Sequence, residues 1–138
     1  MISLKMIKAV IDTNVFLSGL FFGGEPKKVL DLCLQRKIIG ITSKEILSEL
    51  EEKLLGKFEF PPDKTGEFLT LIIKEFAVVE PKEKIDIVED KKDNKIIEAA
   101  MESKADYIVS GDKHLLKIEE YKNIKIVKPK DFLDEIKI

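Results

Sequence analysis

The chain has 138 residues, of which 44% are hydrophobic and 36% charged, and its formal net charge is −2. This length predicts a single domain over residues 1–138, with residues 1–6 as a loose N-terminal tail. The weak net charge excludes a global basic field, so a nucleic-acid partner would be held by local lysines or by metal ions.

The first predicted element is a strand over residues 7–11, which runs directly into Asp12, Thr13 and Asn14. The strand is mostly apolar and rich in β-branched residues, as expected of a parallel strand covered on both faces. In an open α/β sheet, ligands bind in the crevice at the carboxyl ends of the strands. Asp12 is therefore either a ligand or the N-cap of the next helix, and this segment alone leaves both alternatives open.

The rest of the chain alternates between helical and extended patterns. Further strands are predicted over residues 38–42, 77–80, 106–110 and 124–127. Helices or helical turns are predicted over residues 14–22, from residue 25, and over residues 43–55, 61–76, 93–104 and 129–136. On helix 61–76, the predicted apolar stripe consists of Phe68, Leu69, Ile72, Ile73 and Phe76. This alternation predicts a three-layer α/β/α domain with a central, mostly parallel sheet of four to five strands.

Three aspartates occur where a site could form. Asp12 and Asp112 follow predicted strands, and Asp93 opens a helix just after a charged loop. If the strands are parallel, all three lie near the same edge of the sheet. Taken singly, each has a plainer explanation as a helix cap or a turn residue.

A fourth acid is predicted from helix 43–55. The apolar face of this helix is formed by Ile46, Leu47, Leu50 and Leu54. At about 100° per residue, Glu49 and Glu51 lie on opposite borders of that face. Helix geometry therefore leaves both glutamates as candidates.

The negative charges of several carboxylates at one edge of the sheet must be compensated. Two unit charges about 4 Å apart repel by about 4 kcal/mol at an effective dielectric near 20. Such a cluster takes up protons, pairs with lysines or binds a divalent cation. With oxygen ligands available and only one cysteine and one histidine in the chain, the composition favours Mg²⁺ or Mn²⁺ over Zn²⁺. Carboxylate-held metal with open positions is the usual arrangement for phosphodiester chemistry.

Four segments occur together in a recognisable order: residues 10–16 (VIDTNVF), 43–50 (SKEILSEL), 90–100 (DKKDNKIIEAA) and 105–116 (ADYIVSGDKHLL). On these segments the chain resembles the PIN-domain family of nucleases, of the PilT N-terminus type, from residue 7 to about residue 132. The similarity extends to the VapC-like toxin components of toxin–antitoxin systems. It implies an endoribonuclease that prefers single-stranded RNA, depends on Mg²⁺ or Mn²⁺, often forms a homodimer or higher oligomer, and has an antitoxin partner. Lys91 departs from the pattern, because a proline commonly occupies that position.

The resemblance also implies the site residues. The four metal-binding acids of the family match Asp12, Glu49, Asp93 and Asp112, which selects Glu49 over Glu51. Asn14 and Ser110 match positions that support the site by hydrogen bonding. The implied roles are that Asp12 and Asp112 ligate the principal ion, while Asp93 and Glu49 hold a second ion or orient and deprotonate the attacking water. Whether one or two ions act stays open.

Other residues near the four acids, or on the predicted surface, leave their roles more open. Lys113 is either a phosphate contact or a solvated lysine, and His114 is expected to be a polar turn residue rather than a general base. The lysine-rich residues 82–95 are expected to form a solvated face rather than an RNA groove. Apolar residues of helix 61–76, with Phe21 and Phe22, would cover either a dimer interface or the core.

Two other functions fit the sequence less well. A catalytically silent PIN fold that binds RNA or protein would be expected to lack some of the acids, and all four are present. A phosphotransferase of the haloacid-dehalogenase type would need a second aspartate two residues after Asp12, where Asn14 stands.

The single cysteine and the distribution of apolar residues indicate where in the cell the protein is found. Cys33 is the only cysteine, so no disulfide can form within the chain, as expected of a reducing cytoplasm. No apolar stretch approaches the roughly 18 residues of a membrane span, and charges interrupt the N-terminal apolar run. We therefore expect a cytoplasmic protein without a membrane partner.

Overall fold

The structure, a computed structural model, describes residues 6–137, so most of the predicted tail lies outside the described residues. The helices are α1 (Thr13–Phe21), α2 (Gly24–Leu34), α3 (Lys44–Leu55), α4 (Pro62–Glu75), the 3₁₀ helix η1 (Lys91–Asp93), α5 (Asn94–Ser103), α6 (Lys113–Leu116) and α7 (Pro129–Ile136). The strands are β1 (Lys8–Ile11), β2 (Ile39–Ser43), β3 (Ala77–Val79), β4 (Tyr107–Val109), β5 (Glu120–Tyr121) and β6 (Ile124–Val127).

Over the described residues the strands form one six-stranded sheet in the order β3-β2-β1-β4-β6-β5. All neighbours are parallel except β5 and β6, which are antiparallel. In register, Ile11 on β1 lies opposite Val109 on β4, which lies opposite Val127 on β6. The predicted mostly parallel sheet is confirmed, and it has six strands because the sequence pattern missed the two-residue β5.

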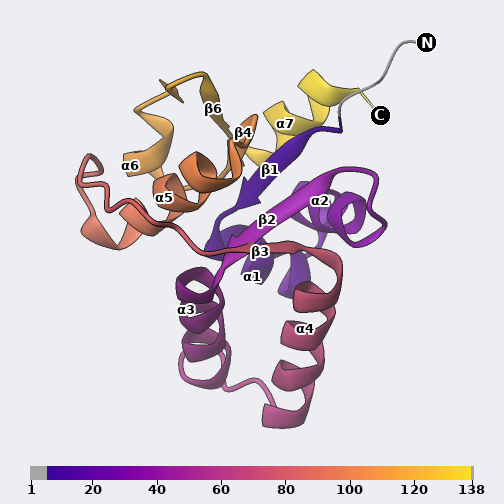
Figure 1. Cartoon of the computed structure of the whole chain (residues 1–138). Coiled ribbons are helices and arrows are strands. Elements are labelled where there is room, and N and C mark those ends of the chain that lie inside the picture. Colours follow the sequence, from indigo (N-terminus) through magenta and orange to yellow (C-terminus); the bar gives the residue numbers. More distant parts are fainter. Residues whose placement is uncertain (1–5, 138) are drawn as a thin grey trace.

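Helices cover both faces of this sheet (Figure 1). Helix α5 packs against β1, β2, β3 and β4, whereas α2 packs against β2, α1 and α7. The crossover from β1 to β2 and the crossover from β3 to β4 run in opposite directions along the sheet. Since parallel crossovers are right-handed, the two sets of helices lie on opposite faces. The predicted three-layer α/β/α architecture is therefore confirmed.

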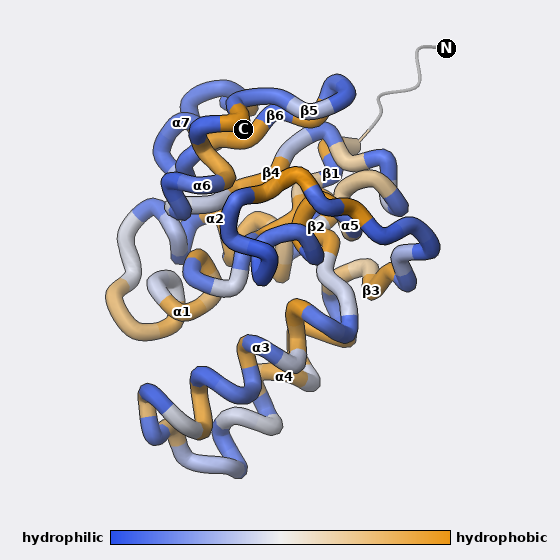
Figure 2. Tube along the Cα trace, turned by 90° about the vertical axis from the view of Figure 1, so that its left-hand side faces the viewer, coloured by the Kyte–Doolittle hydropathy of each residue, from blue (hydrophilic) through white to orange (hydrophobic). Residues whose placement is uncertain are grey.

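The core lies around the central strands. Ala9, Val10 and Ile11 on β1 are fully buried, as are Ile108 and Val109 on β4. Figure 2 shows hydrophobic residues concentrated along these strands. Burial on both faces explains why β1 shows an almost continuous apolar run.

Helices α3 and α4 form a pair that extends away from the sheet (Figure 2). Ser43 caps α3 by accepting a hydrogen bond from the backbone N–H of Ile46 at 3.3 Å, as the sequence predicts. The predicted apolar stripe of α4 is only partly buried, because Ile72 is 1% exposed whereas Ile73 is 55% exposed. None of the helices within residues 6–137 is long and apolar enough to cross a membrane.

Candidate active site

The strand order places two of the predicted acids between β1 and β4, where the chain reverses the direction in which it adds strands to the sheet. After β1 the chain moves towards β2, and after β4 it moves the opposite way towards β6, although β1 and β4 are neighbours. Asp12 directly follows β1, and Asp112 follows β4 after Ser110 and Gly111. Ligands of open α/β sheets bind at such a topological switch point.

Asp12 is the most buried of the candidate acids, with only 4% of its surface exposed. Its backbone N–H donates to the Val109 carbonyl oxygen at 3.0 Å, which fixes the start of α1 against β4. The Ser110 hydroxyl donates to Asp12 Oδ2 at 2.7 Å. Burial raises the pKa of Asp12, although the hydrogen bonds from Ser110 and from the Thr13 backbone oppose this rise. Asp12 precedes α1 but makes no side-chain cap, so the carboxylate is free for another role.

Ser110 also connects Asp12 to the second aspartate. This serine is fully buried, and its hydroxyl oxygen accepts a hydrogen bond from the Asp112 backbone N–H at 3.0 Å. Asp112 itself caps α6, since its Oδ1 accepts from the His114 backbone N–H at 2.7 Å. The cap and the ligand alternatives are thus compatible, because capping engages one of the two carboxylate oxygens.

Asp93 ends η1 and lies against Asp112. Burial, followed by the charge of Asp112 and a hydrogen bond shared with it, raises the pKa of Asp93 to about 7. Asp93 Oδ2 is buried and has no hydrogen-bond partner within the described part of the chain. The three aspartates therefore repel one another at neutral pH and leave one buried oxygen unsatisfied.

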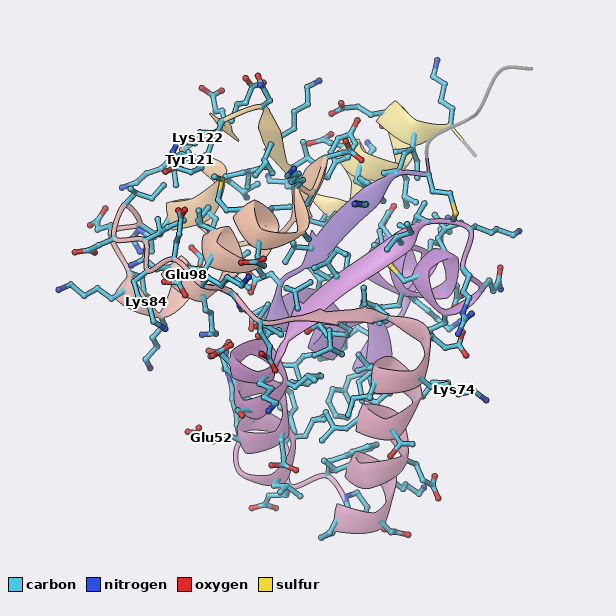
Figure 3. The ribbon with its side chains drawn as sticks, viewed as in Figure 1. Glu52, Lys74, Lys84, Glu98, Tyr121 and Lys122 are labelled. Carbon is cyan, nitrogen blue, oxygen red and sulfur yellow. The ribbon has the colours of Figure 1, made fainter. Side chains whose placement is uncertain are left out.

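The segment before Asp93 is held in place by α5. The side chain of Asn94 accepts hydrogen bonds from the backbone N–H groups of Ile87 and Val88, at 3.1 and 2.9 Å. One turn later, Glu98 accepts from the Ile85 backbone N–H at 3.0 Å. Figure 3 shows Glu98 beside the segment that carries Lys84. These buried side chains fix the charged loop, and with it the position of Asp93.

Glu49 lies at the border of the aspartate cluster and has partners of its own. The Thr13 hydroxyl donates to Glu49 Oε1 at 2.6 Å, and the ammonium groups of Lys95 and Lys53 lie 3.2 and 3.7 Å from its oxygens. Burial raises the pKa of Glu49, but the bond from Thr13 and the two lysines outweigh burial, and the net shift is downward. Its charge still reaches Asp12, whose pKa it raises slightly. Glu51, the alternative from helix geometry, is exposed.

The supporting and neighbouring candidates fall in different places. Ser110 lies between two of the acids, whereas Asn14 is exposed and its side-chain oxygen accepts from Lys53 at 3.3 Å. Lys113 is exposed at the first position of α6. His114 Nδ1 lies 3.5 Å from Glu89 of the charged loop.

Two residues of the site were missed by the sequence reasoning. Thr13 is 1% exposed and holds Glu49, and Lys95 pairs with the same carboxylate. Thr13 could have been found from its position directly after Asp12. Lys95 gave no signal, because it is 46 positions from Glu49 and only the fold brings the two together.

The donor set fits a hard divalent cation. All the candidate ligands are carboxylate oxygens, one of which is buried and unsatisfied, and a cation would relieve the mutual repulsion of the aspartates. Within residues 6–137, no three acidic, histidine or cysteine side chains are yet close enough to ligate one ion. Binding would therefore require these side chains to move closer together.

Comparison with known proteins gives both sequence and structural matches. Residues 8–114 match the family model described as PIN domain. The chain is 35% identical over 142 residues to the uncharacterized protein MJ1680 of Methanocaldococcus jannaschii, with 94% of this chain and 91% of that protein covered.

Solved structures share the fold. VapBC2 from Rickettsia felis, bound to a promoter DNA fragment, matches with a TM-score of 0.61 and 13% identity over 87% of this chain and 97% of that chain. The PIN domain endonuclease Utp24 matches with a TM-score of 0.55 and 22% identity, covering 86% and 82%. FitAcB from Neisseria gonorrhoeae matches with a TM-score of 0.54 and 14% identity, covering 88% and 97%.

Proposed function

Because the chain belongs to the PIN-domain family, we propose that it is an endoribonuclease that hydrolyses phosphodiester bonds of single-stranded RNA with Mg²⁺ or Mn²⁺. The observation that carries this proposal is the convergence of Asp12, Asp93 and Asp112 at the switch point of the sheet. Burial, followed by the charges of Asp112 and Asp12, raises the pKa of Asp93 to about 7, as expected of a carboxylate in a partly buried acidic cluster.

In this proposal Asp12 and Asp112 would hold the principal cation, with Asp93 and Glu49 at the border of the same site. The chemistry that a divalent cation supplies at such a cluster is stabilisation of negative charge on the phosphoryl oxygens. Ser110 orients the site by binding the carboxylate of Asp12 and the backbone of Asp112 through one hydroxyl.

Proton transfer from the attacking water is assigned to the other two carboxylates. Glu49 stays ionised at neutral pH, because Thr13 and two lysines lower its pKa against the effect of burial. The pKa of Asp93 is raised to about 7, chiefly by burial, which suits a group that accepts and returns a proton.

We also propose a biological setting. The sequence resemblance to VapC-like toxins and the fold shared with VapBC2 support a toxin of a toxin–antitoxin pair, acting in the cytoplasm with an antitoxin partner. Expression of the chain should then arrest growth, and co-expression of an adjacent small gene should relieve the arrest. Normal growth under strong expression would contradict the toxin role but not the nuclease activity.

The nuclease activity is tested by cleavage of a mixed single-stranded RNA with Mg²⁺ or Mn²⁺. We expect Asp12→Asn and Asp112→Asn each to lower the rate by more than about 100-fold, since each removes a carboxylate that would hold the cation. Asp134→Asn is the matched control, because Asp134 is exposed on α7 and outside the cluster.

Three outcomes are informative. Cleavage that is unchanged in both cluster variants would refute the site assignment. Absence of cleavage by every form, together with tight RNA binding, would favour a catalytically silent scaffold. Loss of activity in the Asp134→Asn control to the same degree would show that the effect is not specific to the cluster.

A further inference from the structure

A groove of about 520 Å³ lies beside the acidic cluster, between α3 and the turn that joins η1 to α5. Its lining consists of Lys44, Glu45, Ser48, Glu49, Glu52, Lys53, Lys92 and Lys95. Two lysines of α3 and two from residues 92–95 therefore meet in one depression, although the chain as a whole has a net charge of −2. The sequence predicted a solvated face for the lysine-rich residues 82–95; Lys92 is exposed, and it lies with Lys95 across the groove from α3.

The four lysines differ in how they are held. Lys95 donates to the Lys92 carbonyl oxygen at 2.6 Å and pairs with Glu49 at 3.2 Å. Lys53 bonds the side chain of Asn14 at 3.3 Å. The ammonium groups of Lys44 and Lys92 have no hydrogen-bond or ion-pair partner among residues 6–137. The ammonium groups of Lys95 and Lys53 are thus held by other residues, whereas those of Lys44 and Lys92 are exposed and available to a ligand.

The groove is continuous with the candidate active site. Glu49 belongs to both, since it lines the groove and accepts the hydrogen bond from Thr13, the residue directly after Asp12. At the other wall, Lys92 immediately precedes Asp93. A chain of phosphates lying along the four lysines would therefore end at the aspartates.

The lining indicates which part of a nucleic acid would be bound. None of the described lining residues is aromatic, so the groove offers no surface on which bases could stack. Lysine ammonium groups bind phosphates as point charges and carry no sequence information. The three glutamates reduce the net positive charge, although Glu52 points outward from α3 (Figure 3).

We propose that this groove binds the phosphate backbone of single-stranded RNA and leads it to the acidic cluster, with Lys44 and Lys92 as the principal contacts. This inference rests on the proposed nuclease function and adds a substrate-binding surface to it. Because lysine contacts to phosphates carry no sequence information, binding through the groove is independent of base sequence.

The test is binding of a labelled single-stranded RNA to the full chain in EDTA, where cleavage is absent, measured by fluorescence anisotropy over a range of salt concentrations. We expect the double variant Lys44→Ala/Lys92→Ala to bind about 10-fold more weakly or worse. Its plot of log K against log salt should be shallower by about 1.4, since each single-strand phosphate contact contributes about 0.7. Both side chains are exposed, so the variant should retain the melting temperature of the wild type.

Lys28→Ala/Lys130→Ala is the matched control, because these two lysines line a different depression between α2 and α7 and the charge change is identical. Equal affinity and equal salt slope for the wild type and the Lys44/Lys92 variant would overturn the proposal, as would an equal loss in the control or failure of the wild type to bind RNA. Weaker binding in the Lys44/Lys92 variant alone supports it.

The proposal for the groove and the proposal of nuclease activity can be refuted independently. Cleavage by the wild type, with unchanged cleavage and binding in the Lys44/Lys92 variant, would overturn the groove alone. Lysine-dependent binding by a wild type that never cleaves RNA would support the groove and overturn the nuclease function.

Discussion

Asp93 should destabilise the cation-free protein, and Asp93→Asn should therefore stabilise it. The substitution keeps the shape of the side chain but removes a charge that is disfavoured by burial and repelled by Asp112 and Asp12. The rise in the pKa of Asp93 from 3.8 to about 7 corresponds to an upper limit of about 4 kcal/mol. Because the side chain is partly exposed and shares its proton with Asp112, solvent screening reduces this to about 1–2 kcal/mol.

The direction of the pH dependence follows from the raised pKa. In the unfolded chain Asp93 loses its proton near pH 4, whereas in the folded chain it keeps the proton up to about pH 7. The folded state therefore binds more protons between these values, and the free energy of unfolding falls as the pH rises through this window. The advantage of the Asn variant should be small at pH 4 and reach its maximum above pH 7.

The assay is thermal unfolding in EDTA at pH 5 and pH 8, followed by circular dichroism. At pH 8 we expect Asp93→Asn to raise the melting temperature by about 3–8 °C, from the entropy of unfolding of a domain of this size. The control is Asp134→Asn, which removes an exposed aspartate on α7. A melting temperature at pH 8 that is unchanged or lower in Asp93→Asn, or an equal gain in the control, would refute the reasoning.

Three further predictions concern the cation, its supporting serine and the packing of the sheet. Mg²⁺ should raise the melting temperature of the wild type and so reduce the difference in melting temperature between the wild type and Asp93→Asn, because a cation relieves the repulsion among the aspartates. An unchanged melting temperature of the wild type in Mg²⁺ would contradict this. Ser110→Ala removes the hydroxyl that donates to Asp12 Oδ2, and Mn²⁺ affinity measured by calorimetry should fall about 10–100-fold. Gly40→Ala should cost about 1–3 kcal/mol in urea unfolding, because the new Cβ would lie 2.6 Å from Phe76 Cε2. Its control is Gly66→Ala within α4, where nothing lies within 4 Å and stability should rise slightly.

The elements that the sequence predicted well are those with a strong local signal. The closing helix matches α7 (Pro129–Ile136), because its proline fixes the first turn and its apolar residues recur at helical spacing. The strand before Asp12 matches β1 because an uninterrupted apolar run ends at a polar cluster. The missed elements are short: β5 has two residues, and α6 has four and begins at the cap made by Asp112.

The candidate site likewise has features that the sequence predicts and features that only the fold reveals. The positions of Asp12 and Asp112 at strand ends could be predicted, because the carboxyl ends of parallel strands meet at one edge. The order of the strands could not, since it depends on pairings between distant segments, and it is this order that places the two aspartates at the switch point. The lysines around Glu49 also come from separate segments, so their convergence is visible only in the fold.

Both edges of the sheet are unusually short, and this limits how copies of the chain can associate. At one edge β3 has three residues and is followed by Glu80 and Pro81, and at the other edge β5 has two. Short edges flanked by charge and proline offer little backbone for another strand to pair with. The sheet is thereby protected against edge-to-edge aggregation, and we expect any self-association to use helical surfaces instead.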